Sequence, residues 1–514
     1  MICKRRAIPF LGPISIVFMS KCHYVKICIC QNVRCLECLS SAWDCICVVG
    51  HKIVPLRSFF GYMIRKFFET YLPFYKRNLK VALPIICSQL CIGIVQLVDT
   101  LMVGRLGTVE LASVAFASSV FAVGNVFSMG ILLGLTPLVG QSFVRGEYAR
   151  CAHLFQNAFL LAVIAGGVVC ALLFAAMLFM PFMGQEPEVV ELAVPYFFTI
   201  VVSLVPQLLF LTFKQFLEGL GNTKTAMWIT VITIFVNIFF NYVLIYGKWG
   251  FPQWGVFGAG VATLIARLVA PLIFFGCMRL KPAWWSYIRA FRWRLFRWRS
   301  LGELLRIGLP ISGQMVLETA SFAFTGIMIG WLGAVPLAAN QVVANLSNLT
   351  FMLMIGIALA TTIRVSHQIG ARDYKAMTMA ASASIHLALM VEVLTALLFI
   401  LGGRAMMSAF SNDPAVIDLG TQLCVCVGFF QIFDGMQAVG IGILRGLTDV
   451  KVIMRNAFIA YILINLPLSY VLAFPCGLGA LGVWTAFIFG IGTAAVLYYV
   501  RYRKIRRVKF DELQ

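Results

Sequence analysis

The sequence predicts an all-α polytopic membrane protein of twelve spanning helices, arranged as two related six-helix lobes. Three observations support this prediction: an excess of apolar residues, apolar blocks of membrane-spanning length, and an internal repeat. Hydrophobic residues make up 61% of the 514 residues and charged residues only 12%, whereas a soluble globular chain is about 45–50% apolar. This composition excludes an ordinary soluble domain.

The apolar residues are gathered in blocks of about 20 residues, the length that a helix needs to cross a hydrocarbon layer of about 30 Å. Ala158–Met180 and Ala480–Tyr499 are examples. Because the blocks are apolar on every face and do not alternate as barrel strands do, helices are the predicted spanning elements. We place the twelve helices at residues 79–103, 114–138, 152–180, 192–213, 225–246, 256–278, 302–331, 337–363, 377–400, 416–443, 453–474 and 479–500.

Basic residues give the chain a net charge of +21 and fall on alternate connections between the blocks. One side of the predicted membrane collects most of them, whereas the other has little beyond Arg105, Lys248 and Arg404. By the positive-inside rule, both termini are predicted to be cytoplasmic. For the Arg- and Trp-rich stretch from Trp284 to Arg299 we expect an interfacial linker helix on anionic lipid. An RNA-binding strip is the alternative, and no nucleic-acid partner is expected.

The first 62 residues differ from the rest because they hold half of the 16 cysteines. Cys35 and Cys38 form a CxxC motif near His23 and His51, but the spacing fits no standard zinc finger. A short apolar run resembles a signal peptide without a clear cleavage site. We interpret residues 1–62 as a disordered extension or as the product of a mis-set start codon, with Met63 as the natural start.

The second half of the chain repeats the first half at a constant offset. Leu309-Pro310 lies 226 residues after Leu83-Pro84, and the same offset relates Gly330 to Gly104. Because six spans return the chain to the same side of the membrane, the repeats are parallel and can enclose a cavity that opens to either side. The predicted domains are the extension at 1–62, an N-lobe at 63–278, a basic linker at 279–301, a C-lobe at 302–500 and a basic cytoplasmic tail at 501–514.

Three acidic residues lie inside predicted spans, where a charge costs about 2.5–3.5 kcal/mol on insertion scales. They are Asp99 in the first span, Glu318 in the seventh and Asp434 in the tenth. A carboxylate can bind a proton or a hard cation such as Na⁺, so these are the predicted cation-coupling residues. Structural hydrogen bonding is the alternative. A fourth acid, Glu392, lies in the ninth span, and the sequence identifies no partner for it.

Two pairs of amide residues support the same interpretation. Asn237 and Asn241 are four residues apart in the fifth span, and Gln341 and Asn345 are four apart in the eighth. Each pair shares a helix face and can supply neutral oxygens to a cation or position a carboxylate. Packing between helices is the alternative role.

The motifs around these residues resemble those of the MATE family, the multidrug and toxic compound extrusion transporters, in its NorM-type bacterial branch. The resemblance runs from about Lys80 to Tyr499. Some relatives carry a tyrosine one turn before the tenth-span aspartate, where this chain has Phe430. The motifs that carry the resemblance are Val98-Asp99-Thr100 with Gly104, Leu317-Glu318, Ala338-Ala339-Asn340-Gln341-Val342, Asp434 with Leu444-Arg445-Gly446, and Asn241-Tyr242 with Tyr246-Gly247.

The resemblance implies a V-shaped pair of lobes and a monomeric, secondary active exporter in the bacterial inner membrane. Such a protein exchanges Na⁺ or H⁺ for amphipathic, often cationic drugs by alternating access, and needs no other cofactor. The resemblance also implies two polar sites. The N-lobe site contains Asp99, Asn237 and Asn241, and the C-lobe site, a candidate Na⁺ site, contains Glu318, Asp434, Gln341 and Asn345.

Other functions are less well supported by the sequence. A flippase for lipid-linked sugars or other amphipathic substrates would favour basic residues in its cavity, whereas the residues in the middle of these spans are acidic or amide. The five histidines form no catalytic motif, so no enzyme activity is expected. No Walker-type glycine loop is present, so ATP is not the expected energy source, and nothing repeats like a channel's selectivity filter.

Overall fold

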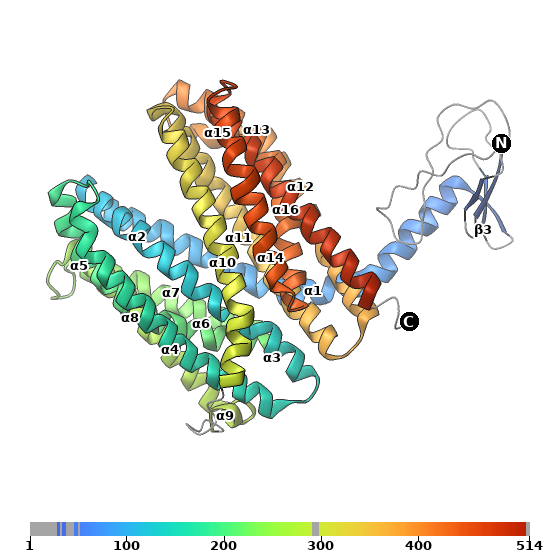
Figure 1. The fold of residues 1–514 in the computed structure, drawn as a ribbon, viewed down its shortest axis with the longest axis horizontal. Coiled ribbons are helices and arrows are strands. Elements are labelled where there is room, and N and C mark those ends of the chain that lie inside the picture. The colour runs from blue at the N-terminus through green and yellow to red at the C-terminus, as the bar shows by residue number, and fades with distance from the viewer. Residues whose placement is uncertain (1–27, 31–32, 38–45, 50–51, 290–297, 510–514) are drawn as a thin grey trace. The chain divides into compact units, whose positions relative to one another are not determined.

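The computed structural model describes residues 28–30, 33–37, 46–49, 52–289 and 298–509 (Figure 1). The chain divides into two compact units, Met1–Pro73 and Phe74–Gln514. The first unit contains a small antiparallel sheet, which the sequence does not predict. Its strands pair in the order β1 (Cys28–Cys30), β2 (Val33–Glu37), β3 (Ile46–Val49) and β4 (Lys52–Pro55).

Of the residues considered for a zinc site, Cys35 lies on β2, whereas His23, Cys38 and His51 lie outside the described residues. The interpretation of residues 1–62 as an extension or a mis-set start stays a prediction.

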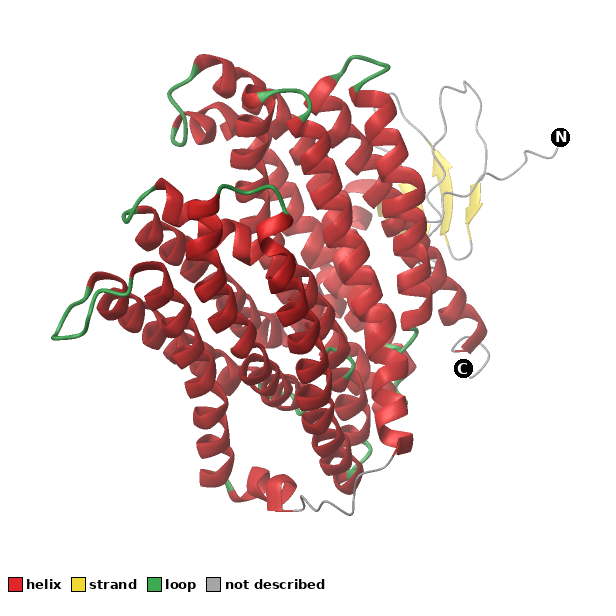
Figure 2. Cartoon of the chain, turned by 60° about the vertical axis from the view of Figure 1, so that its left-hand side comes forward, coloured by secondary structure: helices red, strands yellow, loops and turns green. Residues whose placement is uncertain are grey.

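All the regular secondary-structure elements of the second unit, among the residues that the structure describes, are helices (Figure 2). The N-lobe consists of α1 (Leu56–Gly104) from Phe74 onward, α2 (Thr108–Leu132), α3 (Leu135–Val144), α4 (Tyr148–Phe179), the 3₁₀ turn η1 (Met180–Phe182), α5 (Pro187–Val202), α6 (Leu204–Gly219), α7 (Thr223–Tyr246) and α8 (Gly255–Leu280). After α9 (Pro282–Arg289), the C-lobe consists of α10 (Trp298–Gly330), α11 (Ala334–Gly370), α12 (Tyr374–Ser408), α13 (Pro414–Gly446), α14 (Val450–Ala457), η3 (Phe458–Asn465), α15 (Leu466–Ala473) and α16 (Gly479–Lys509).

Eleven of the twelve predicted spans coincide with helices that are long and apolar enough to cross a membrane, counted over the described residues. The predicted seventh span, 302–331, is the exception. It forms α10, a helix of 33 residues that packs against α2, α11 and α14. Gln314 and Glu318 lower its mean hydropathy, and both belong to the polar site described below. The helix predicted here is therefore present, but it is more polar than its neighbours.

Proline explains one difference between the two lobes. The second predicted span is interrupted between α2 and α3, because Pro137 has no backbone N–H to donate to the carbonyl of Leu133. The equivalent residue of the second repeat is Ile363, and α11 continues unbroken through this position. Hence the repeats share a register but not every helix break.

Several helices begin at a capping side chain or end at a glycine. The side chain of Asn222 accepts a hydrogen bond from the backbone N–H of Thr225 and caps α7, and Asp373 caps α12 in the same way through Ala376. Such caps are worth about 1 kcal/mol. Gly247 ends α7 in the left-handed conformation, with φ 65°, which a glycine adopts without steric cost.

The two lobes pack closely through equivalent glycines. A Cβ atom on Gly130 of α2 would lie 2.5 Å from the Cα of Ser312 on α10. Its counterpart in the second repeat, Gly356 of α11, faces Ile86 of α1, where the nearest backbone atom would lie 2.9 Å away. Ile86 and Ser312 are themselves 226 residues apart. The sequence repeat is therefore also a repeat of contacts between the lobes.

The hydrogen bonds that cross between the lobes lie toward one end of the bundle. Ser312 of α10 donates to the carbonyl of Phe127, and Asn78 of α1 donates to Ser384 of α12. At the other end, the described polar contacts stay inside one lobe, as when Tyr246 donates to the carbonyl of Met102. The lobes are thus joined at the end that carries most of the basic connections.

The predicted eleventh span, 453–474, is not a uniform α-helix. Its central part, η3, is a π-helix of eight residues. Widened turns of this kind are rare and are frequent at functional sites. Here the π-helix carries Tyr461, whose side chain is fully buried.

Candidate functional site

The predicted N-lobe residues meet in the structure. The side-chain amide of Asn241 on α7 donates to Asp99 of α1 at 2.6 Å and to Asn237 at 3.2 Å. Asn237 and Asn241 are buried, and Asp99 is partly buried. An amide donor stabilises a carboxylate, while the oxygen of Asn241 remains buried without a partner. The three residues therefore form one polar cluster with an oxygen still available.

The sequence analysis did not identify Arg267 as a partner of this cluster. Arg267 lies on α8, where it donates to the hydroxyl of Ser203 at 2.7 Å and stacks over the ring of Phe121. Its charge is close enough to attract Asp99 electrostatically. The sequence did contain a signal for this partner: Arg267 lies in the middle of the predicted span 256–278, where a charged side chain needs a partner of opposite charge.

The C-lobe contains a larger network around Glu318. Gln314, one turn earlier on α10, donates to one carboxylate oxygen of Glu318 at 2.6 Å. Tyr461 of η3 donates to the other oxygen at 3.0 Å, and Gln437 of α13 donates to the Tyr461 hydroxyl at 2.6 Å. Three helical elements are thereby tied to one carboxylate.

Arg445 is the cation of this network. The predicted tenth span ends at residue 443, before Arg445, but α13 extends to Gly446 and Arg445 donates to the Gln314 side chain at 2.8 Å. Gln314 thus links the guanidinium to Glu318, and the two charges attract each other. The Nε of Arg445 is buried without a partner.

Asp434 lies in the same lobe with two other acids near it. It is 6% exposed, and no hydrogen bond to it is found among the described residues. The negative charge of Asp434 is repelled by the charges of Glu392 and Glu318. The Glu392 side chain packs against Gly435, the residue that follows Asp434. Glu392, for which the sequence offered no partner, accepts a hydrogen bond from Thr395 at 2.8 Å.

The remaining predicted residues make no described hydrogen bond to this network. Gln341 and Asn345 both have exposed side chains on α11, and no described hydrogen bond joins either one to Glu318 or Asp434. Their shared helix face is as predicted, and their position near the C-lobe carboxylates stays a prediction. Phe430, which replaces a tyrosine of some relatives, is buried against Trp484.

The C-lobe network can accept a proton or a small cation. It holds three carboxylates, those of Glu318, Glu392 and Asp434. Among the described residues, Arg445 is the one arginine whose charge acts on Glu318, and it reaches that carboxylate through Gln314. Buried oxygens of Glu392 and Gln437 have no donor. Like charges in a low-dielectric interior are costly without compensation. Although the described residues contain no group of three or more His, Cys, Asp or Glu arranged as a metal site, carboxylate and amide oxygens are suitable ligands for a hard cation.

A two-lobed helical membrane protein with a partly buried carboxylate in one lobe and buried carboxylates in the other has the architecture of a secondary transporter. Comparison with known proteins also identifies a transporter. The MatE family model matches the chain twice, at residues 84–243 and 310–471. The two matches begin 226 residues apart and confirm the internal repeat. The chain belongs to the MatE family, whose members are multidrug transporters and not enzymes.

Individual relatives agree with this assignment. The probable multidrug resistance protein NorM of Rhizobium meliloti is 31% identical over 440 residues, which cover 84% of this chain and 94% of that protein. The multidrug resistance protein NorM of Photobacterium profundum is 32% identical, with 85% and 97% of the two chains covered.

Solved structures share the fold. The eukaryotic MATE transporter AtDTX14 superposes with a TM-score of 0.77 at 20% identity, covering 84% of this chain and 96% of that one. A multidrug resistance MATE transporter in an outward-facing conformation has a TM-score of 0.77, also at 20% identity, with 84% and 95% covered. The predicted MATE-like fold is confirmed.

Proposed function

We propose that this protein exports amphipathic, often cationic drugs across the bacterial inner membrane in exchange for Na⁺ or H⁺. The carboxylate cluster of Glu318, Glu392 and Asp434 carries the proposal, because it concentrates acidic groups inside the C-lobe. In the part of the chain that the structure describes, Arg445 is the one arginine that acts on the cluster, through Glu318. A cation or a proton would supply the missing positive charge. The names of the relatives, multidrug resistance proteins, support drugs as the transported class.

Coupling follows from differential binding. A cation that binds Glu318 and Asp434 would favour one state of the lobes, and a drug would favour the other, so that binding of one promotes release of the other. The lobes of this structure are joined at the end that carries the basic connections. If that end is cytoplasmic, as the positive-inside rule predicts, this conformation is the one that receives a cation from outside and releases the drug there.

The test is efflux of ethidium from proteoliposomes under separately imposed Na⁺ and H⁺ gradients. Wild-type protein is expected to respond to one of the two gradients, and Asp434→Asn to neither. Asp418→Asn is the matched control, because Asp418 lies on the same helix, α13, but is 60% exposed and pairs with Arg404. Gradient-driven efflux by Asp434→Asn at the rate of the control would refute an essential coupling role for Asp434.

A further inference from the structure

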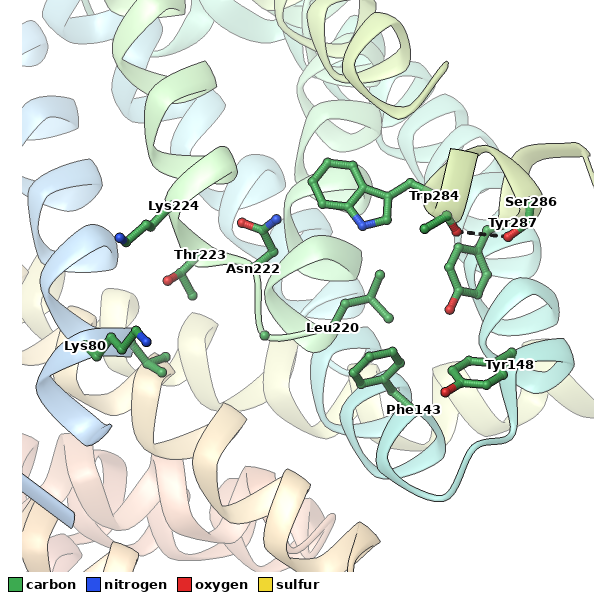
Figure 3. A pocket seen from close by; sticks show the side chains of 13 residues that line it. Lys80, Phe143, Tyr148, Leu220, Asn222, Thr223, Lys224, Trp284, Ser286 and Tyr287 are labelled. Carbon is green, nitrogen blue, oxygen red and sulfur yellow. Dashed lines mark hydrogen bonds between the residues drawn. The ribbon is translucent and has the colours of Figure 1, made fainter. Parts of the chain in front are cut away.

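A cavity lies away from the carboxylate clusters, at the ends of several spans (Figure 3). Its volume is about 820 Å³, within the usual range of ligand sites of about 300–1,000 Å³. It is bordered by the first spanning part of α1, the turn between α6 and α7, the start of α4, and α9. None of the predicted or observed transport residues lines it, so it needs its own explanation.

Two lysines mark one wall of the cavity. Lys80 of α1 and Lys224 of α7 both line it, and both are exposed. No acidic residue is among the lining residues, and the ion pairs found in the described part of the chain include neither lysine. Two uncompensated ammonium groups on one wall favour an anionic ligand.

Aromatic side chains form the opposite wall. Trp284 and Tyr287 of α9 and Tyr148 at the start of α4 face the lysines across the cavity in Figure 3. Burial, with a smaller effect of Cys151, raises the pKa of the Tyr287 hydroxyl to about 12. Tyr287 therefore stays neutral at physiological pH and can donate a hydrogen bond. This wall offers apolar surface with a few polar groups.

The cavity lies where a membrane surface is expected. Lys224 is the second residue of a candidate span, Thr223–Tyr246, and α9 follows directly after another, Gly255–Leu280. Tryptophan and tyrosine are enriched at this level of the membrane, and basic residues there contact anionic lipid. The lysine wall is also held in place, since Asn78, half a turn before Lys80, donates to the carbonyl of Ala380 and to Ser384, both at 3.0 Å.

We propose that this cavity binds one anionic phospholipid, with the phosphate between Lys80 and Lys224 and an acyl chain along Trp284 and the neighbouring aromatic wall. A phosphodiester matches two ammonium groups, and an acyl chain matches an apolar wall beside the hydrocarbon layer. A free phosphate ion would use the lysines but leave the aromatic wall without a ligand. The site is separate from the carboxylate clusters, and binding there does not depend on transport.

Binding of short-chain lipids to the purified full chain in detergent tests the proposal. The probes are dioctanoyl phosphatidylglycerol, dioctanoyl phosphatidylcholine and sodium phosphate, with lipid adducts counted by native mass spectrometry. Phosphatidylglycerol is expected to bind at one molecule per chain, and the double variant Lys80→Gln, Lys224→Gln to bind it about 30-fold more weakly, from about a factor of five or more for each lysine at a membrane surface. Trp284→Ala is expected to weaken phosphatidylglycerol without affecting phosphate.

The matched control is the double variant Lys76→Gln, Lys375→Gln, which removes the same charge from exposed positions that do not line the cavity. It is expected to bind phosphatidylglycerol like the wild type. Equal phosphatidylglycerol affinity in the Lys80, Lys224 variant would overturn the proposal, and so would phosphatidylcholine binding as tight as phosphatidylglycerol. Phosphate binding as tight as phosphatidylglycerol would instead assign the cavity to a free anion. Because these lysines are exposed, an unchanged melting temperature without lipid establishes that the variants are folded.

Discussion

Gln141 and His367 occupy the same position in the two repeats, and each is bonded to the backbone of the opposite lobe. Gln141 of α3 donates to the carbonyl of Gly446 at 3.0 Å, and His367 Nε2 lies 2.8 Å from the carbonyl of Gly219. Since a carbonyl only accepts, His367 Nε2 must carry the hydrogen. The two bonds form a symmetric brace at the end where the lobes are joined.

The brace gives the first prediction. The double variant Gln141→Ala, His367→Ala should open the joined end, because each hydrogen bond contributes about 1 kcal/mol and its loss leaves a carbonyl without a donor. The ratio of closed to open molecules should fall by about tenfold to thirtyfold, measured from the distribution of spin-label distances between the ends of α6 and α13. Gln368→Ala, a change on the same helix, serves as the control. An unchanged distance distribution in the double variant would show that the brace does not hold the closed state.

Tyr461 gives the second prediction. Tyr461→Phe removes the hydroxyl that donates to Glu318 and accepts from Gln437. Glu318 and Gln437 then keep only a hydrogen bond of 3.5 Å between them at this point. Loss of a hydrogen bond to a charged group costs about 1.5–3 kcal/mol, so the melting temperature should fall and cation-driven efflux should decrease about tenfold. Thermal unfolding and dye efflux measure the two effects. Tyr470→Phe, at a tyrosine that is 50% exposed, should leave both unchanged, and the same result for Tyr461→Phe would contradict the network.

The third prediction concerns Arg267 and Asp99. Arg267→Met should destabilise the N-lobe by removing the cation that attracts Asp99. Adding Asp99→Asn should recover part of the loss, since no isolated charge then remains. A double-mutant cycle from thermal unfolding should give a coupling free energy of about 0.5–3 kcal/mol. Arg105→Gln, at an exposed position, should show no coupling to Asp99→Asn. Strictly additive effects of Arg267→Met and Asp99→Asn would mean that the two charges do not interact.

The sequence predicted the helices and the repeat better than the details of each site. The apolar blocks and the 226-residue offset depend only on which residues the chain contains and on their order, so both can be identified from the sequence. The association of Asp99 with Asn241 was also predicted, because the resemblance places both residues in one site. Pro137 could have predicted the break between α2 and α3, but the predicted span 114–138 runs through it without interruption.

The C-lobe network could not be predicted because it depends on how helices are rotated against one another. Tyr461 reaches Glu318 from a π-helix, and no spacing in the sequence shows that widening. Gln341 and Asn345 share a helix face as predicted, but spacing along α11 does not say which neighbour that face meets. Arg445 lies beyond the predicted end of the tenth span at residue 443, whereas α13 continues to Gly446 and places it beside Gln314.

The most direct test of cation coupling is the dissociation constant of ethidium for the purified protein, measured at increasing Na⁺ and, separately, at falling pH. Linkage requires that a cation which drives drug release also weakens drug binding. The wild type should show weaker binding with one of the two cations, and Asp434→Asn should show no dependence on either. Cation dependence that persists unchanged in Asp434→Asn, or that is absent from the wild type, would contradict coupling through the C-lobe carboxylates.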